Sequence, residues 1–491
     1  MKRFVQFTLT YAVLMFIGNL LYDPEYGNFF FLLLTAFGLL YNLAITFWTD
    51  TLSKEYKLLS GGFIGAFSCF IIFNGGIITL IYLKDFDFIS ANRLGRFLNY
   101  EMLVKYNNVV ALANIFYWFG YRSKFGDKIF TAYHKGLKFD RFLKLDVGVK
   151  FPKILIVFGL LVNTILLFNG AFGRGVAEAE SFSGPLRILV TFSSYFEKIA
   201  MVGYFMLALY YFKTGKQKLW FYTSAVLLVI FALLSGARGP IIFLFLLTTL
   251  SYYYIRKRIT KAIIIGGVIC ISVAFTVAAE IKRFTQFASS GVEFSEYAET
   301  FIEFREQSDA ELNRVIYESL YYNIVVRLTT VAPGAIAVDY IDNNNLTPED
   351  PDFMGELSVV PLSVFVPRSF VFGGNFPSWG NWFRVEILGF STTYRSNTSF
   401  GSIAFFYFAG GWWFVALGFF FYGVALKFCN RILHLNSTFS FLIYLALLST
   451  IGYLSASIPT AIISFIRYAI FVPPLLYFII REINRRDIRW A

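Results

Sequence analysis

The chain contains 491 residues, of which 57% are hydrophobic and 15% are charged, and its formal net charge is +12. Soluble domains hold about 25% charged residues, so this composition excludes a soluble globular protein and predicts an all-α polytopic membrane protein. The basic residues are spread along the chain and form no concentrated basic face, which excludes a nucleic-acid-binding protein.

Apolar runs about one bilayer thick recur along the chain. Because a membrane-spanning helix needs about 20 apolar residues, we expect about twelve transmembrane helices. Their predicted ranges are about 4–22, 27–49, 58–83, 106–121, 154–172, 188–212, 219–234, 241–255, 262–279, 401–426, 437–456 and 460–480. The two short runs beside 235–240 also fit a helical hairpin that crosses only part of the membrane.

Basic residues are divided unequally between the two sides that these helices define. Both termini and the even-numbered connections are rich in basic residues, as in 122–153 and 256–261. The positive-inside rule therefore places both termini in the cytoplasm. The predicted organisation is transmembrane helices over 1–279, a large extracytoplasmic loop over 280–400, and three further helices with a cytoplasmic tail over 401–491.

The predicted outer loop begins with an amphipathic pattern. Phe294, Tyr297 and Phe301 recur at spacings of three and four, with acidic residues elsewhere on the helical wheel. This pattern predicts a helix of about 25 residues that lies against the bundle or the membrane surface.

Cysteine and histidine are placed where they cannot build an outer metal site. Cys69 and Cys270 fall inside predicted spans and Cys429 in a cytoplasmic connection, so no disulfide or metal framework is available. His134 and His434 fall in cytoplasmic connections, where we expect solvated side chains. We therefore expect neither a metal nor another cofactor.

The cations of the predicted outer face are mainly arginines, and its lysines are Lys84, Lys105 and Lys282. Arginine binds phosphate and carboxylate groups through two parallel hydrogen bonds, whereas lysine is a hydrated point charge. The outer face is thus suited to bind an anion. The alternative is that these arginines pair with the acidic residues of the loop.

Three ionisable residues fall inside predicted spans: Glu197, Lys198 and Arg467. Neighbouring residues on a helix point about 100° apart, so Glu197 and Lys198 cannot be each other's main partner. Each of the three needs a partner on another helix, either at a functional site or in a structural ion pair.

Ser235–Pro240 reads SGARGP and lies at the outer end of the seventh predicted span. Small residues allow a ligand to approach the backbone, and Pro240 can begin the next helix. Because a helix N-terminus beside an arginine is suited to bind an anion, Arg238 is a candidate ligand for a lipid headgroup.

Further short motifs follow in a fixed order. They are RLTTVAPG at 327–334, MGELS at 354–358, VPRSF at 366–370 and NTSFGSIAFFYFAGGWW at 397–413. With the predicted topology, this order resembles the oligosaccharide repeat-unit polymerases, the O-antigen polymerase (Wzy-type) family. The resemblance covers roughly 235–423, and the first six predicted spans match only as generic membrane helices.

The resemblance implies a bacterial inner-membrane glycosyltransferase with a GT-C-like fold. Members of the family transfer a glycan chain from undecaprenyl pyrophosphate to the non-reducing sugar of a new lipid-linked repeat unit, which builds an O-antigen, a capsule or an exopolysaccharide. The implied partners are undecaprenyl-pyrophosphate-linked glycans, the lipid bilayer, a flippase and a membrane protein that regulates chain length.

By motif position, Arg238 and Arg368 are expected to bind the pyrophosphate headgroup. Glu356, Glu280 and Glu318 are candidates for the general base that deprotonates the attacking sugar hydroxyl. The expected substrate-binding residues are outer arginines and polar motif residues, namely Arg283, Arg314, Arg327, Arg384, Arg395, Ser235 and Thr398. Because arginines in a partly dry cleft can stabilise the departing pyrophosphate, we expect a reaction that needs no metal.

The chain departs from the family pattern at Ser402, where an acidic residue commonly precedes the aromatic stretch. This puts a carboxylate role at that position in doubt. Another GT-C glycosyltransferase, with Asp23 or Glu25 as its carboxylate, is one alternative. An O-antigen ligase shares the arginines, although the predicted outer face has no histidine. A lipid-linked oligosaccharide exporter is the remaining alternative, but the halves of the chain do not match as paired repeats would.

Overall fold

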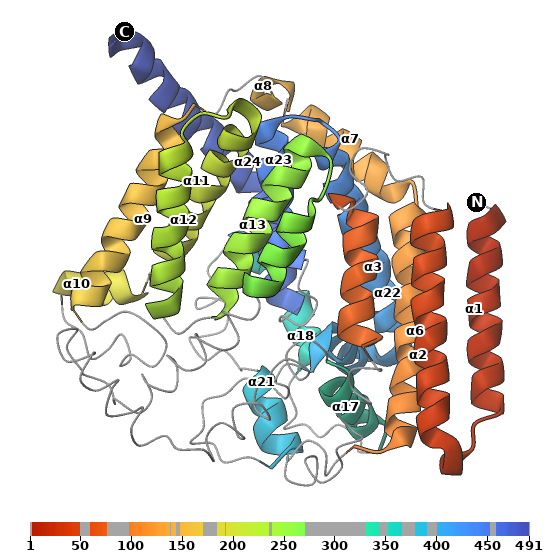
Figure 1. Cartoon of the computed structure of the whole chain (residues 1–491). Helices are drawn as coiled ribbons and strands as arrows, with labels where there is room; N and C mark the ends of the chain where they lie inside the picture. Colours follow the sequence, from red (N-terminus) through yellow and green to blue (C-terminus); the bar gives the residue numbers. More distant parts are fainter. Residues whose placement is uncertain are drawn as a thin grey trace. The chain divides into compact units, whose positions relative to one another are not determined.

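The computed structural model describes thirteen stretches of the chain, residues 2–49, 59–75, 98–137, 139–143, 148–169, 184–191, 193–234, 238–270, 330–343, 352–365, 379–389, 400–451 and 458–490. Within these stretches the regular structure is helical, without a strand (Figure 1). The prediction of an all-α fold is therefore confirmed for the described residues. The predicted amphipathic helix near Phe294 lies outside them.

Five helices of the described stretches are long and apolar enough to cross a membrane: Lys2–Leu20, Pro24–Phe47, Lys150–Phe168, Gly401–Leu433 and Ala461–Glu482. Shorter apolar helices cover Lys218–Leu234, Pro240–Arg256, Lys261–Cys270 and Thr438–Ile451. These helices fit a membrane protein. Twelve complete crossings, the GT-C-like fold and the cytoplasmic location of the termini stay predictions.

The chain divides into two compact units, of which unit 1 comprises Met1–Lys144 and Tyr322–Tyr477 and unit 2 comprises Leu145–Tyr321 and Phe478–Ala491. The predicted division at residues 279 and 400 follows membrane sidedness, whereas the units follow packing. Each unit is described by itself below.

Unit 1 contains the first helices and the helices around the last predicted spans. Its main elements are α1 Lys2–Leu20, α2 Gly27–Ala44, α3 Gly61–Phe73, α6 Tyr100–Arg122, α7 Phe125–Gly136, α8 Asp140–Leu143, α17 Val331–Asn343, α18 Phe353–Ser358, α19 Val360–Phe365, α21 Trp379–Trp382, α22 Gly401–Leu433, α23 Thr438–Ile451 and most of α24 Ile458–Trp490. A 3-10 turn covers Pro24–Tyr26, and π-helical turns η2 and η7 cover Ile45–Thr49 and Phe383–Ile387.

Helices α6 and α22 form the centre of unit 1, and glycines allow their backbones to touch. A methyl group on Gly120 of α6 would collide with the carbonyl oxygen of Phe420 of α22. A methyl group on Gly423 of α22 would collide with the carbonyl oxygen of Tyr117 of α6. Small residues at such crossings give membrane helices the close packing that lipid-excluded interfaces need.

Polar side chains connect α6 to the neighbouring helices. The Asn107 amide donates to Thr35 Oγ1 at 3.1 Å and to the carbonyl oxygen of Phe31 at 3.3 Å. The Trp118 indole donates to Asn42 Oδ1 at 2.9 Å. Because these groups lie in the interior of the helix bundle, their hydrogen bonds hold α6 to α2 without exposing polar atoms to lipid.

Helix α22 is interrupted at Gly410 and Gly411, although the sequence predicted a continuous tenth span. Gly411 has a φ of +62°, in the left-handed region that glycine adopts without a Cβ clash. The Gly-Gly pair therefore separates a short first segment of α22 from its longer second part.

Helix α7 packs its aromatic side against the end of α22. Tyr133 contacts Phe428 with ring centroids 5.0 Å apart, and its hydroxyl donates to the carbonyl oxygen of Ala469 at 2.8 Å. His134, expected to be solvated, has only 25% of its side chain exposed and packs against Phe139.

Unit 2 is built from α9 Lys150–Phe168, α10 Gly184–Thr191, α11 Ser193–Thr214, α12 Lys218–Leu234, α13 Arg238–Arg256 and the helical segment Lys261–Cys270. Its core surrounds Tyr204 of α11, which stacks on Phe221 and shares a hydrogen bond with Thr248 at 2.8 Å. Lys198, expected inside a span, is exposed in α11.

Candidate functional site

Two of the sequence motifs meet on α6 at one end of unit 1. The Thr330 amide, from the RLTTVAPG motif, donates to the carbonyl oxygen of Ile72 at 3.0 Å. Gly401, from the last motif, has a φ of +82°, and a Cβ there would lie 2.6 Å from Thr330 Oγ1. Gly334 packs on the Tyr106 ring, where an added Cβ would lie 2.7 Å away. The glycines of both motifs thus allow α17 and α22 to begin side by side on α6.

The MGELS motif forms α18, which packs against α22. Asp352 caps this helix, because its carboxylate accepts a hydrogen bond from the Gly355 amide at 2.7 Å. Glu356, the predicted general base, lies in α18, but its side chain is outside the described part of the structure. Its neighbour Leu357 lines a groove beside α22.

Helix α19 follows, and Arg467 of α24 fixes its C-terminal end. Arg467 Nη2 donates to the carbonyl oxygen of Ser363 at 2.6 Å, and Nε donates to that of Val364 at 2.9 Å. The last carbonyls of a helix lack partners within the helix, and a cation at this end is favourable. The partners that the sequence required for Arg467 therefore include main-chain oxygens of another segment.

A charged cluster lies where the C-terminal end of α17 meets α6 and α22; we call it the Lys105 cluster. Lys105 Nζ lies 2.7 Å from Asp342 Oδ2 and 3.5 Å from Asp339 Oδ1. The Tyr407 hydroxyl of α22 donates to Asp342 Oδ1 at 2.9 Å, and the Asn343 amide donates to Asp339 Oδ2 at 2.8 Å. Two carboxylates and one ammonium leave this cluster with one net negative charge.

The sequence explains why this cluster forms. The first part of α17 is apolar and buried, whereas its last residues are Asp-Tyr-Ile-Asp-Asn. Asp339 and Asp342 are three residues apart and therefore share one face of the helix. Lys105 lies near the start of α6, on which α17 packs. The apolar part of α17 thus places its charged end beside Lys105.

Aromatic residues lie next in the chain to members of the Lys105 cluster. Trp382 of α21 makes edge contacts with Tyr340 of α17, at a centroid distance of 6.3 Å, and with Phe408 of α22, at 5.3 Å. Trp382 and Tyr340 are partly exposed. Such rings combine flat apolar faces with polar edges, so they can pack against the apolar faces of sugar rings.

Arg384, from the predicted substrate-binding set, lies in η7 directly after α21. Only 2% of the Arg384 surface is exposed. Phe383, which precedes Arg384 in the chain, packs its ring against that of Phe400 at the start of α22. An anion can contact the Arg384 side chain only if η7 or its neighbours move.

The other predicted site residues are less completely described. Arg238 begins α13 in unit 2, but its side chain is outside the described atoms, as is that of Glu356. The remaining residues lie wholly outside the described stretches: Arg283, Arg314, Arg327, Arg368, Arg395, Ser235 and Thr398. The structure therefore leaves the predicted arginine site as a prediction.

An apolar groove of about 650 Å³ runs along α22 and is also lined by residues of α7, α18, α23 and α24. Leu357 and Phe406 line one part of it, and Tyr133 and Ala469 line another. Phe406 lines this groove while the next residue, Tyr407, belongs to the Lys105 cluster. A charged cluster and an apolar groove therefore lie on adjacent faces of the same turn of α22.

The carboxylates of this site have an internal cation as their partner. Among the described residues, no group of three or more His, Cys, Asp or Glu side chains could hold a metal ion. Asp339 and Asp342 instead share Lys105. Asp23, the carboxylate of an alternative mechanism, caps the turn at Pro24–Tyr26 by accepting a hydrogen bond from the Glu25 amide at 2.9 Å.

Lys105 and Tyr407 were not among the predicted site residues. Two sequence signals could have pointed to them: Lys105 is one of few lysines on the predicted outer face, and two aspartates end an otherwise apolar segment. Comparison of the chain with family models, with curated proteins and with solved structures gave no match. The family resemblance therefore depends on the short motifs alone.

Proposed function

We propose that the protein is a membrane glycosyltransferase that polymerises oligosaccharide repeat units carried on undecaprenyl pyrophosphate. The observation that carries this proposal is that two neighbouring residues of α22 have different surroundings, one apolar and one charged. Phe406 faces an apolar groove, and Tyr407 hydrogen-bonds to a charged cluster. A lipid-linked sugar needs this combination, because its prenyl chain requires an apolar surface and its glycan requires hydrogen-bonding groups.

The Lys105 cluster is suited to bind the sugar that accepts the growing chain. Asp339 and Asp342 are partly exposed and offer carboxylate oxygens to sugar hydroxyls, and the ring of Trp382 offers a flat face. Hydrogen bonds to charged acceptors are stronger than those between neutral groups. In this proposal, the contacts of Lys105 and Tyr407 hold the two carboxylates in place for the acceptor.

The chemical step is a displacement at the anomeric carbon of the donor chain. An acceptor hydroxyl oxygen forms the new glycosidic bond, the bond from the anomeric carbon to the pyrophosphate oxygen breaks, and the hydroxyl proton passes to a base. Glu356 is our candidate for that base, and Arg238 and Arg368 would stabilise the pyrophosphate as it leaves. These three roles derive from the motif resemblance.

Deletion of the gene in its host tests this function. We expect the surface polysaccharide ladder to collapse to single repeat units and the lipid-linked single unit to accumulate. An O-antigen ligase would instead leave long chains on the lipid carrier, and an exporter would leave single units on the cytoplasmic side. Either of these two results would contradict the proposal.

A further inference from the structure

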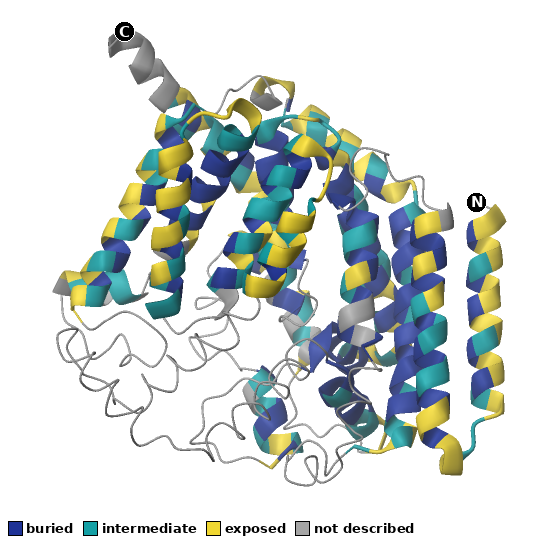
Figure 2. Ribbon diagram, viewed as in Figure 1, coloured by how far each residue is buried: buried dark blue, intermediate teal, exposed yellow. Residues whose placement is uncertain are grey.

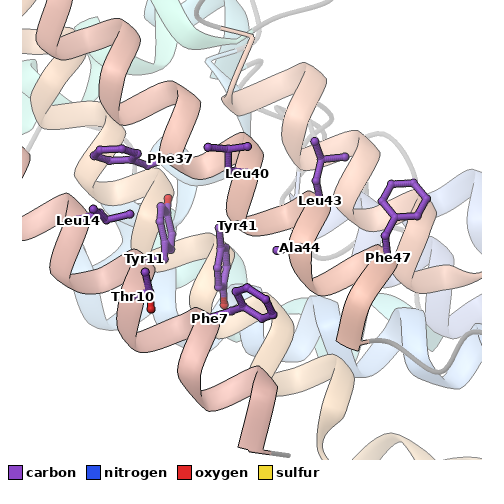
Figure 3. A pocket seen from close by; sticks show the side chains of 10 residues that line it. All are labelled: Phe7, Thr10, Tyr11, Leu14, Phe37, Leu40, Tyr41, Leu43, Ala44 and Phe47. Carbon is purple, nitrogen blue, oxygen red and sulfur yellow. The ribbon is translucent and has the colours of Figure 1, made fainter.

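A second hollow lies in unit 1, away from the Lys105 cluster. Side chains of α1, α2 and the adjoining turn η2 line an apolar groove of about 590 Å³ (Figure 3). Its floor is formed by Tyr11 and Tyr41, whose rings stack at a centroid distance of 4.3 Å. Its rim contains Leu40 and Phe47, which are exposed. We call it the α1–α2 groove.

The α1–α2 groove continues into a basic end. Arg3 and Gln6 line a smaller hollow that shares Phe7 and Thr10 with the groove. Arg3, Phe7, Thr10 and Leu14 recur at spacings of four and three, so they lie on one face of α1. One face of α1 thus extends from the Arg3 cation to the apolar lining of the α1–α2 groove.

The length of this surface matches one leaflet of a bilayer. From Arg3 to Leu14, α1 rises by about 16 Å at 1.5 Å per residue. Half of the hydrocarbon core of a bilayer is about 15 Å thick. Helix α1 is also one of the helices able to cross a membrane. Arg3 would therefore lie at the level of the headgroups and Leu14 near the bilayer midplane.

The floor of the groove offers little to a polar ligand. The Tyr41 hydroxyl shares a hydrogen bond with Thr8 Oγ1 at 3.1 Å. Tyr11 and Tyr41 are each only 3% exposed, so neither side chain offers a ligand a free polar surface. A sugar or peptide would lose its hydrogen bonds to water in the groove, whereas a hydrocarbon chain would lose none.

We propose that the α1–α2 groove binds one acyl chain of an anionic phospholipid from the leaflet that contains the N-terminus, with the lipid phosphate against Arg3. The proposal is independent of the glycosyltransferase activity. It follows from the apolar lining, the cation at one end and the match in length to a leaflet. Basic residues at a membrane surface attract anionic lipids, whereas a zwitterionic headgroup has no net charge to attract.

Native mass spectrometry of the purified full chain tests this site. The protein is equilibrated with phosphatidylglycerol or with phosphatidylcholine, and the retained lipid molecules are counted. Thr10→Trp fills the groove, and Leu9→Trp is its matched control, because Leu9 is 61% exposed on the opposite side of α1. Arg3→Gln removes the cation, and Lys2→Gln removes an exposed cation that lies off the groove face.

We expect one phosphatidylglycerol molecule to be retained by the wild type and by both controls. Arg3→Gln should weaken its retention about fivefold, and phosphatidylcholine should be held about as weakly. Thr10→Trp should weaken retention about tenfold or more, because part of the acyl chain loses its contact surface.

Three results would overturn the proposal. The first is equal retention in Thr10→Trp and Leu9→Trp, because the lipid would then lie elsewhere. The second is competition by glycerophosphoglycerol, which lacks acyl chains, as effective as that of the intact lipid, because Arg3 would then bind only a phosphate. The third is a dimer that retains no lipid, because a second copy of the chain would then cover the groove.

Discussion

Helices α1 and α6 have similar lengths and opposite surroundings. One side of α1 is exposed, as Figure 2 shows, and it includes the apolar residues Leu9, Phe16 and Leu20, all more than 60% exposed. Helix α6 is largely buried and carries Asn107 and Asn114 in its interior-facing surface. By length and hydropathy α1 is a candidate membrane span, whereas α6, which contains the predicted span 106–121, falls below that hydropathy.

The comparison shows that a helix at the centre of a membrane protein can have a lower hydropathy than a helix at its periphery. A helix that faces lipid must be apolar, because lipid satisfies no hydrogen bond. A helix enclosed by other helices can hold amides, because neighbouring helices supply their partners. Sequence hydropathy therefore ranks α1 above α6 as a membrane helix, although α6 organises the packing of unit 1.

The largest expected effect comes from the crossing of α6 and α22. We expect Gly120→Leu to destabilise the protein by about 4 kcal/mol or more, because the side chain would displace the α22 backbone. Gly136→Leu is a matched control, since no atom lies within 4 Å of an added Cβ there. Gel filtration should show a monodisperse peak only for the control. A monodisperse Gly120→Leu protein would contradict the contact between the two helices.

A smaller loss is expected at Arg467 of α24, a helix whose candidate span, like that of α1, is mostly exposed. Arg467→Met removes two hydrogen bonds to the end of α19, and we expect a loss of about 2 to 3 kcal/mol in unfolding free energy. Arg467→Lys should restore part of this loss, because an ammonium cannot reproduce both contacts of the guanidinium. Unfolding in SDS measures the difference. Equal stability of the wild type and Arg467→Met would exclude this anchoring role.

The amides of α6 provide the next effect. Asn107→Leu removes the hydrogen bonds to α2, and comparable bonds between membrane helices contribute about 0.6 to 1.7 kcal/mol. Leu9→Ala, on the exposed side of α1, should change the unfolding free energy by no more than about 0.5 kcal/mol. The same SDS titration compares them. A larger loss for Leu9→Ala would reverse the contrast between the two helices.

The smallest effect on stability is expected at Lys105, near the N-terminal end of α6. Lys105 has 31% of its side chain exposed, so Lys105→Met should cost less than about 1 kcal/mol despite two ion pairs. If the cluster binds the acceptor sugar, polymer formation should nevertheless fall sharply. Lys124→Met, at an exposed lysine before α7, is the control. Normal polymer length in Lys105→Met would remove the cluster from the site.

The sequence predicted the helical segments well, because their signal is the length of apolar runs. Each of the twelve predicted spans contains helix in the structure. The packing of α6 on α22 could not be predicted in the same way, because it joins segments about three hundred residues apart through backbone contacts at Gly120 and Gly423. The interruption at Gly410 and Gly411 has a visible signal, a Gly-Gly pair within an apolar run.

The site was less predictable than the fold. The sequence required a partner for Arg467, but it could not identify the carbonyl oxygens of Ser363 and Val364, since every residue has a carbonyl group. The motif resemblance indicated arginines, most of which lie outside the described stretches. The charged cluster around Lys105 depends on the meeting of three helices, a relation that no local pattern contains.

The most direct test of the proposed function is the elongation of purified lipid-linked repeat units by the reconstituted protein, followed as a ladder of product lengths. We expect a ladder from the wild type, also in excess EDTA, and no ladder from Arg238→Ala or Arg368→Ala. Asp342→Asn should slow elongation about tenfold or more, because it weakens the charged hydrogen bonds that we assign to the acceptor sugar. Absence of a ladder from folded wild-type protein, or a wild-type ladder from Arg238→Ala and Arg368→Ala, would contradict the account.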